Sequence, residues 1–168
     1  DPIFEDPFYF NTKISDEDGK IEGIINWFDA MEPINESYCN TIKTPMGGTH
    51  ESGFKTGIFK AFKEFSKLKY EKKSSQINQE DLFGSSASIL SVFLENPEFQ
   101  GQTKEKLSSI EPGRKIESKI KILFEQWLTS KTKSAEELFL YAFNRSQLRL
   151  QNRSNQIIDK NIKRKKTT

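Results

Sequence analysis

The stretch from residue 88 to residue 107 constrains the fold most, because it predicts a strand, a loop and a helix in direct succession. Residues 88–94 are mostly apolar and partly β-branched, a pattern typical of a buried strand. Pro97 and Gly101 then interrupt the pattern, and a run of good helix formers begins at Lys104. We therefore expect the chain to leave a sheet, cross a polar loop and enter a helix here.

This junction is a candidate anion-binding site. It would present Gln102, Thr103 and Lys104 beside the free N–H groups of a helix N-terminus, with Thr103 as the candidate N-cap. A lysine near a terminal phosphate stabilises charge that develops during phosphoryl transfer, and a glutamine amide can donate a hydrogen bond to the same oxygens. Taken alone, Gln-Thr-Lys is more often a solvated turn, so the surrounding sequence has to decide.

Upstream of this stretch, the pattern predicts three strands and a long helix. Strands are expected near residues 8–10, 21–28 and 36–42, the second and third forming a hairpin. A glycine-rich turn at residues 47–53 follows, with Thr49 as a candidate cap for the next helix. That helix is expected from apolar residues at three- and four-residue steps, which are Phe54, Ile58, Ala61, Phe62, Phe65 and Leu68.

Downstream of the loop, the pattern predicts a break and two further helices. Residues 108–114 form the break, and an apolar stripe then runs from Ile116 to Leu128. Residues 130–134 interrupt this helix, and Ser134 begins the last one with a pattern similar to a capping box.

The last helix grows more polar along its length. Beyond about Asn144 it has too few apolar residues for a packed stripe, so we expect it to project as a connector. We therefore divide the chain into a core domain, residues 1–134, and a C-terminal connector helix with a basic end, residues 135–168.

The composition excludes several classes of protein. The 168 residues carry a net charge of +2 and include 14 Phe, enough aromatic bulk for one modest core. No apolar stretch approaches the roughly 18–20 residues of a membrane span, and no signal-peptide pattern is present. A single cysteine, Cys39, excludes an internal disulfide and is expected in the core. These features predict a soluble, cytoplasmic protein without a membrane partner.

The sequence also lacks the residue sets of the common catalytic and metal sites. It has no Ser-His-Asp set, no Cys-His pair and no metal-ligand spacing. The acidic residues 16–18 lack the ligand spacing of a calcium loop and are expected in a solvated turn. His50, the only histidine, is expected to serve packing or capping rather than catalysis.

Two motifs together resemble a known family. Residues 97–107, Pro-Glu-Phe-Gln-Gly-Gln-Thr-Lys-Glu-Lys-Leu, resemble the signature loop of type IIA DNA topoisomerase ATPase subunits, and residues 47–53, Gly-Gly-Thr-His-Glu-Ser-Gly, resemble that family's Gly-Gly-Thr-His motif. The resemblance extends over residues 8–166. Residues 36–38 and the tail from Arg145 look closer to the topoisomerase IV members of the family than to the gyrase members.

The resemblance implies a transducer domain that follows a GHKL-class nucleotide-binding domain. The implied fold is an α+β two-layer sandwich: a four-stranded mixed sheet, helices on one face and a left-handed βαβ crossover. The implied site residues are Gln102 and Lys104, both contacting the γ-phosphate of ATP, with Lys104 in a catalytic role. The implied cofactors are ATP and Mg²⁺. The implied partners are double-stranded DNA, the topoisomerase A subunit and a second copy of the B subunit, and the isolated chain is expected to be inactive.

Two alternatives stay open at this stage. One is a stand-alone nucleic-acid-binding module that uses the basic residues 160–166 and the lysines of the first long helix. The other is the middle domain of a different GHKL protein, of the mismatch-repair or chaperone kind.

Overall fold

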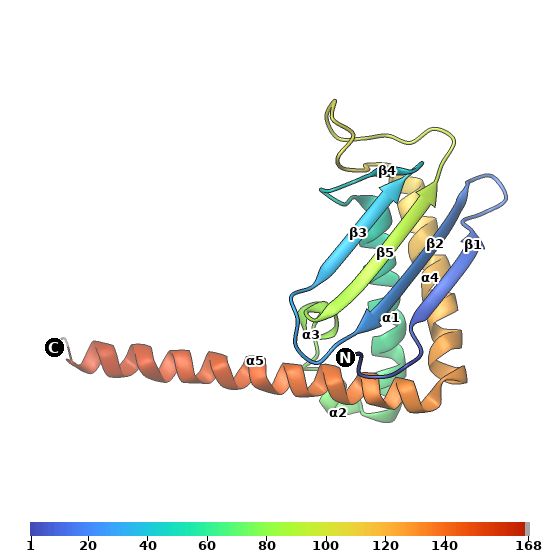
Figure 1. Cartoon of the computed structure of the whole chain (residues 1–168). Coiled ribbons are helices and arrows are strands. Elements are labelled where there is room, and N and C mark those ends of the chain that lie inside the picture. Colours follow the sequence, from blue (N-terminus) through green and yellow to red (C-terminus); the bar gives the residue numbers. More distant parts are fainter. Residues whose placement is uncertain (167–168) are drawn as a thin grey trace.

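The computed structural model describes residues 1–166 as one sheet backed by helices (Figure 1). The sheet is five-stranded, in the order β1-β2-β5-β3-β4. The strands are β1 (Phe8–Lys13), β2 (Lys20–Trp27), β3 (Ile34–Cys39), β4 (Ile42–Lys43) and β5 (Ser86–Phe93). The helices are α1 (Thr49–Lys69), α2 (Glu71–Ser74), α3 (Gln79–Phe83), α4 (Ile110–Ser130) and α5 (Thr132–Lys166).

Strand β5 occupies the centre of the sheet, which overturns the predicted hairpin between the second and third strands. β5 pairs antiparallel with β2 and parallel with β3, so it separates the two strands that we expected to be partners. Strand β2 instead forms a hairpin with β1. Alternating apolar residues define a strand but not its partner, and here the apolar β5 takes the central position.

The sheet has five strands rather than the expected four because a two-residue strand, β4, folds back on β3. Asn40 and Thr41 connect the two strands, with φ angles of 51° and 68°. Positive φ at both central residues is typical of a tight hairpin turn that matches strand twist. The fold class is otherwise confirmed as α+β with a mixed sheet and helices.

The connection from β3 to β5 is a left-handed crossover. In Figure 1 both strands point the same way, β5 lies to the right of β3, and helix α1, which joins them, passes behind the sheet. This arrangement is the rare hand for a βαβ unit, because right-handed crossovers are strongly preferred. It agrees with the hand implied by the family resemblance.

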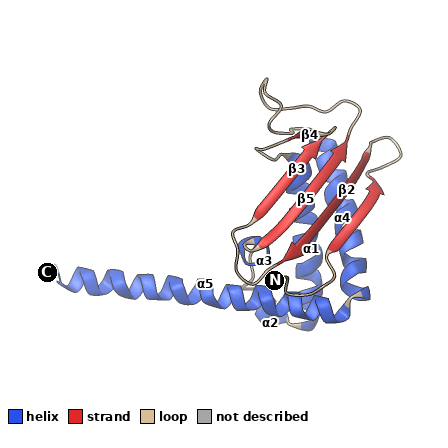
Figure 2. Cartoon of the chain, in the orientation of Figure 1, coloured by secondary structure: helices blue, strands red, loops and turns tan. Residues whose placement is uncertain are grey.

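Helices α1 and α4 cover one face of the sheet (Figure 2). The two helices approach closely at three glycines. A Cβ at Gly53 would lie 2.6 Å from the Gly113 carbonyl oxygen, and one at Gly57 would lie 2.7 Å from the Glu117 carbonyl oxygen. Gly113 also shows that α4 includes residues that the sequence predicted as a break, because the helix begins at Ile110.

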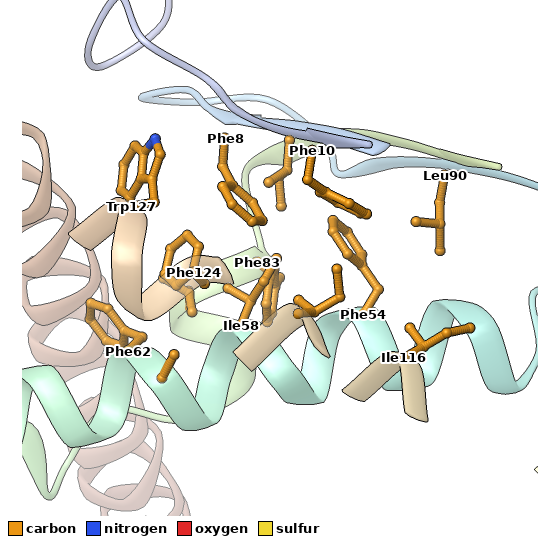
Figure 3. Packing of buried hydrophobic residues seen from close by; sticks show 14 of the residues in the cluster. Phe8, Phe10, Phe54, Ile58, Phe62, Phe83, Leu90, Ile116, Phe124 and Trp127 are labelled. Atoms are coloured by element: carbon orange, nitrogen blue, oxygen red, sulfur yellow. The ribbon is translucent and has the colours of Figure 1, made fainter. Parts of the chain in front are cut away.

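Aromatic side chains fill the space between the sheet and the two helices. Figure 3 shows Phe8 and Phe10 of β1 pointing toward Phe54 of α1 and Phe124 of α4. The Phe8 and Phe124 rings meet edge to face, with centroids 4.9 Å apart. The predicted apolar face of α1 is confirmed except at its end, where Leu68 is 89% exposed.

The last helix begins inside the core and leaves it. Only Lys131 separates α4 from α5, a shorter interruption than the predicted one at residues 130–134. Ala135, Leu138, Phe139 and Ala142 are buried, whereas the residues from Leu150 onward are exposed and extend away from the body (Figure 1). None of the helices within residues 1–166 combines the length and apolar composition that a bilayer-spanning segment requires.

Candidate functional site

Gln102, Thr103 and Lys104 lie at the tip of the loop between β5 and α4, which we call the Gln-Thr-Lys loop (residues 95–109). This loop extends beyond the end of the sheet (Figure 1), and all three side chains are exposed. Within residues 1–166, neither Gln102 nor Lys104 has a side-chain hydrogen bond or ion pair. A lysine and a glutamine are therefore presented outward, as a contact to an external anion requires.

The predicted helix at Lys104 is wrong, and with it the role of Thr103 as a helix cap. Helix α4 begins at Ile110, and Lys104 has a φ of 57°, in the left-handed region. The reason is backbone pairing, because residues 105–108 are held extended by hydrogen bonds to other segments and cannot close helical turns. Lys104 thus acts from a loop tip rather than from a helix N-terminus.

The two arms of the Gln-Thr-Lys loop are joined to each other below the tip. The Gln100 N–H donates to the Lys106 carbonyl over 2.9 Å, and the Ser108 N–H donates to the Glu98 carbonyl over 2.8 Å. The Ser109 hydroxyl also accepts from the Glu98 N–H at 2.8 Å. The loop therefore has an ordered base, although its tip is solvated.

The base of the loop is docked on the Gly-Gly-Thr-His segment, here called the glycine turn (residues 44–50). The Met46 N–H donates to the Glu105 carbonyl (3.0 Å), the Leu107 N–H to the Gly47 carbonyl (3.1 Å) and the Thr49 N–H to the Leu107 carbonyl (3.0 Å). The two sequence motifs are therefore one structural unit, which their separation in the chain did not reveal.

Gly48 is required for this docking. Its φ is 139°, and a Cβ there would lie 2.3 Å from the Leu107 carbonyl oxygen. The helix α1 starts at the next residue without a side-chain cap, so the predicted capping role of Thr49 is wrong. Backbone close approach, rather than capping, explains the glycine.

A buried polar cluster lies behind the glycine turn. The His50 Nε2 is 3.0 Å from the Thr44 Oγ1, which is 2.8 Å from the Ser37 Oγ. The Ser37 hydroxyl has two acceptors at 3.2 Å, the Glu51 carboxylate and the Thr44 carbonyl. Burial lowers the pKa of His50 to about 4, with Glu51 acting weakly in the opposite direction. The predicted packing role of His50 is confirmed, but its partners were not foreseen.

A second polar contact lies at the other end of β5 and fastens helix α5, and we call it the arginine clamp (Arg149 with Asp81 and Gln76). The Arg149 Nε and Nη2 donate to the two Asp81 oxygens over 3.0 and 3.1 Å, and Nη2 also donates to the Gln76 carbonyl over 2.7 Å. Asp81 is 3% exposed and also accepts from the Asn78 N–H. Residues 68 positions apart form this pair, so local patterns could not predict it.

The remaining candidate groups are either paired or buried. Asp18 in the acidic turn pairs with Lys115 at 2.5 Å, and this hydrogen bond lowers the pKa of Asp18. Cys39 is buried as expected, and burial raises the pKa of its thiol. Among residues 1–166, no group of three His, Cys, Asp or Glu side chains could hold a metal ion.

Comparison with known proteins identifies the family. The family model for DNA gyrase B matches residues 1–157. The chain belongs to the DNA gyrase B family. This family comprises the B subunits of type II topoisomerases, gyrase and topoisomerase IV, as the resemblance of the two motifs had predicted.

Relatives of this DNA gyrase B family member are much longer than the chain. The B subunit of DNA topoisomerase 4 from Caulobacter vibrioides is 39% identical over 156 residues, which make up 90% of this chain and 22% of that protein. The Salmonella typhimurium protein of the same name is 33% identical and covers 87% of this chain. The chain spans about a fifth of the length of these curated relatives.

Solved structures agree with this assignment. The topoisomerase IV ATP-binding domain of Francisella tularensis, solved with a small-molecule inhibitor, has a TM-score of 0.77 and 29% identity, and covers 86% of this chain and 40% of that chain. The 43K ATPase domain of Thermus thermophilus gyrase B has a TM-score of 0.80 at 24% identity, over 94% of this chain and 42% of that one. The similarity to the Thermus thermophilus structure supports the fold alone.

Proposed function

We propose that this chain is the transducer domain of the B subunit of an ATP-dependent type II DNA topoisomerase, of the topoisomerase IV branch. In this proposal Lys104 contacts the γ-phosphate of an ATP molecule bound largely by another domain, and Gln102 donates a hydrogen bond to the same phosphate. The observation that carries it is the docked base of the Gln-Thr-Lys loop, which presents both side chains at an exposed tip.

The chemistry at the tip fits a phosphate contact. A lysine ammonium is a compact point charge that can neutralise charge on phosphate oxygens, and an amide N–H can fix their orientation. ATP supplies the transferable phosphoryl group, and Mg²⁺ belongs to the same proposal in the complete subunit. Residues 95–109 contribute only these two contacts, so we propose that the isolated chain neither hydrolyses ATP nor cleaves DNA.

The position of β5 supports the relay of nucleotide state. Its C-terminal end leads directly into the Gln-Thr-Lys loop, and its N-terminal end follows α3, whose Asp81 is bonded to Arg149 of α5. A force on the loop tip would therefore be transmitted along β5 to α3, which is bonded to α5 through the arginine clamp. We propose that α5 passes the change toward the DNA-cleavage part of the enzyme, where the A subunit, a second copy of the B subunit and double-stranded DNA take part.

The test is Lys104→Ala in the complete subunit, with Lys106→Ala as the matched control from the same exposed loop. We expect ATP turnover to fall about 10²-fold in Lys104→Ala, the cost of removing one group that stabilises transition-state charge, while nucleotide binding persists. Lys106→Ala should keep turnover near the wild-type value. Unchanged turnover in Lys104→Ala would contradict the proposal.

A further inference from the structure

The side chains behind the glycine turn form a continuous buried chain of hydrogen bonds from His50 through Thr44 and Ser37 to Glu51. The first three of these residues are each at most 3% exposed. Buried polar groups are costly unless they are bonded, so three of them in a row, ending at the partly exposed Glu51, call for an explanation beyond packing.

The direction of donation in this chain follows from its two ends. The Glu51 carboxylate only accepts at neutral pH, and it is also paired with Lys55 at 3.3 Å. The Ser37 hydroxyl has two acceptors at 3.2 Å, the Glu51 carboxylate and the Thr44 carbonyl. With either acceptor its oxygen is left to accept from the Thr44 hydroxyl, so Thr44 donates to Ser37 and the His50 Nε2–H donates to Thr44. In this tautomer each proton of the His50–Thr44–Ser37 hydrogen-bond chain has an acceptor. Within that chain, only the lone pair of His50 Nδ1 has no partner in the described structure.

The hydrogen bond between Thr44 and His50 joins the first and last residues of the glycine turn on its buried side. The groups on the outer side of the turn, which are the Met46 N–H, the Gly47 carbonyl and the Thr49 N–H, all bind residues 105–107. Lys104 directly precedes this docked segment. The conformation of the turn thus sets where the lysine emerges.

We propose that Thr44 and His50 are positioning residues for Lys104, holding the glycine turn in the one shape that receives the base of the Gln-Thr-Lys loop. They act through Leu107 and Glu105 and do not contact nucleotide. The inference rests on the proposed function for its catalytic consequence, but its structural part concerns only residues 44–50 and 105–107.

The experiment compares Thr44→Val with Thr44→Ser in the complete subunit. Valine keeps the shape but removes the hydroxyl, leaving the His50 N–H without an acceptor, whereas serine keeps the hydroxyl. Two quantities are measured: hydrogen exchange of the Thr49 and Leu107 amides, and kcat and KM for ATP. In Thr44→Val we expect exchange at both amides to be about tenfold faster, the size of one lost buried hydrogen bond. Phe124 in α4 should exchange unchanged.

In the same Thr44→Val variant kcat should fall about tenfold with little change in KM, and Thr44→Ser should restore both measurements. Wild-type exchange at Thr49 and Leu107 would overturn the inference, as would uniformly faster exchange that includes Phe124, which indicates general destabilisation. The proposed function fails separately: if Lys104→Ala retains full turnover, that proposal is wrong, while faster exchange confined to the loop base would still support the positioning role.

Discussion

His50 is a titratable side chain held neutral inside the protein. It has no exposed surface, and burial lowers its pKa to about 4, from a usual value near 6.5. A protonated imidazole would need a second hydrogen-bond acceptor, yet Nδ1 has none in the described structure. We therefore expect that protonation of His50 at low pH disrupts the hydrogen-bond chain formed by His50, Thr44 and Ser37.

This depressed pKa predicts a pH-dependent free energy of unfolding. Between pH 6.5 and pH 4 the unfolded chain binds a proton at residue 50 that the folded chain does not, so stability falls as the pH falls through this window. From pH 7 to pH 5 the loss assigned to His50 should be about 2 kcal/mol. Urea unfolding of the wild type and His50→Gln at both pH values measures it, because other groups contribute equally to both proteins. Equal losses would contradict the assignment.

At the scale of single elements, periodicity predicted the helices and the central strand well. Most apolar residues of the α1 and α4 stripes and of the run that became β5 lie in the core, with Leu68 and Ile89 as exposed exceptions. The sequence could not predict that β5 would separate β2 from β3, because strand partners depend on long-range packing. It also placed a helix start at Lys104, where helix propensity is overruled by pairing of residues 105–107 with the glycine turn.

The candidate site was predictable only in part. Gln102 and Lys104 were expected at the start of a helix after a polar loop; the structure places both in the exposed loop, six or more residues before the helix. The contribution of Leu107, Thr44 and Ser37 was missed, because it depends on backbone contacts between segments that are distant in sequence. Gly48 was the one available signal, since a glycine pair before a helix indicates close approach of another backbone.

The arginine clamp predicts that α5 is fastened at one defined point. In Arg149→Gln the Asp81 carboxylate, 3% exposed, loses its charged partner, and the free energy of unfolding should fall by about 1–3 kcal/mol. Arg153→Gln, one turn further along the exposed part of α5, is the matched control and should stay within about 0.5 kcal/mol of the wild type. Urea unfolding compares the three proteins, and equal stability of the two variants would argue against the clamp.

On the scale of the whole molecule, the loop and the last helix lie at opposite ends of the sheet. Figure 1 shows the Gln-Thr-Lys loop above the strands and α5 crossing below them. The basic end of α5 includes Lys163, Arg164, Lys165 and Lys166, which is the feature that supports the alternative nucleic-acid module. Of the tail that this alternative invokes, residues 167–168 lie outside the described residues.

The proposed transducer domain and the alternative nucleic-acid-binding module predict different affinities for DNA. With a net charge of only +2, the chain should bind duplex DNA weakly at physiological salt, with a dissociation constant on the order of 10⁻⁴ M. Fluorescence anisotropy across a salt series, with and without residues 160–168, measures this. Binding tighter than about 10⁻⁶ M that falls steeply with salt and is lost on deletion would favour the nucleic-acid module.

In the proposed relay, the part of α5 that extends beyond the sheet would act as a lever arm. Beyond the arginine clamp the helix continues from Arg149 to Lys166, and at 1.5 Å per residue this part is about 26 Å long. Turning about the arginine clamp by roughly 10° would move its far end by roughly 5 Å, while residues beside the pivot would hardly move. This amplification requires a stiff helix. Replacing two adjacent residues within 150–158 by glycine should therefore reduce the motion that reaches the far end of α5, without changing either end of the sheet.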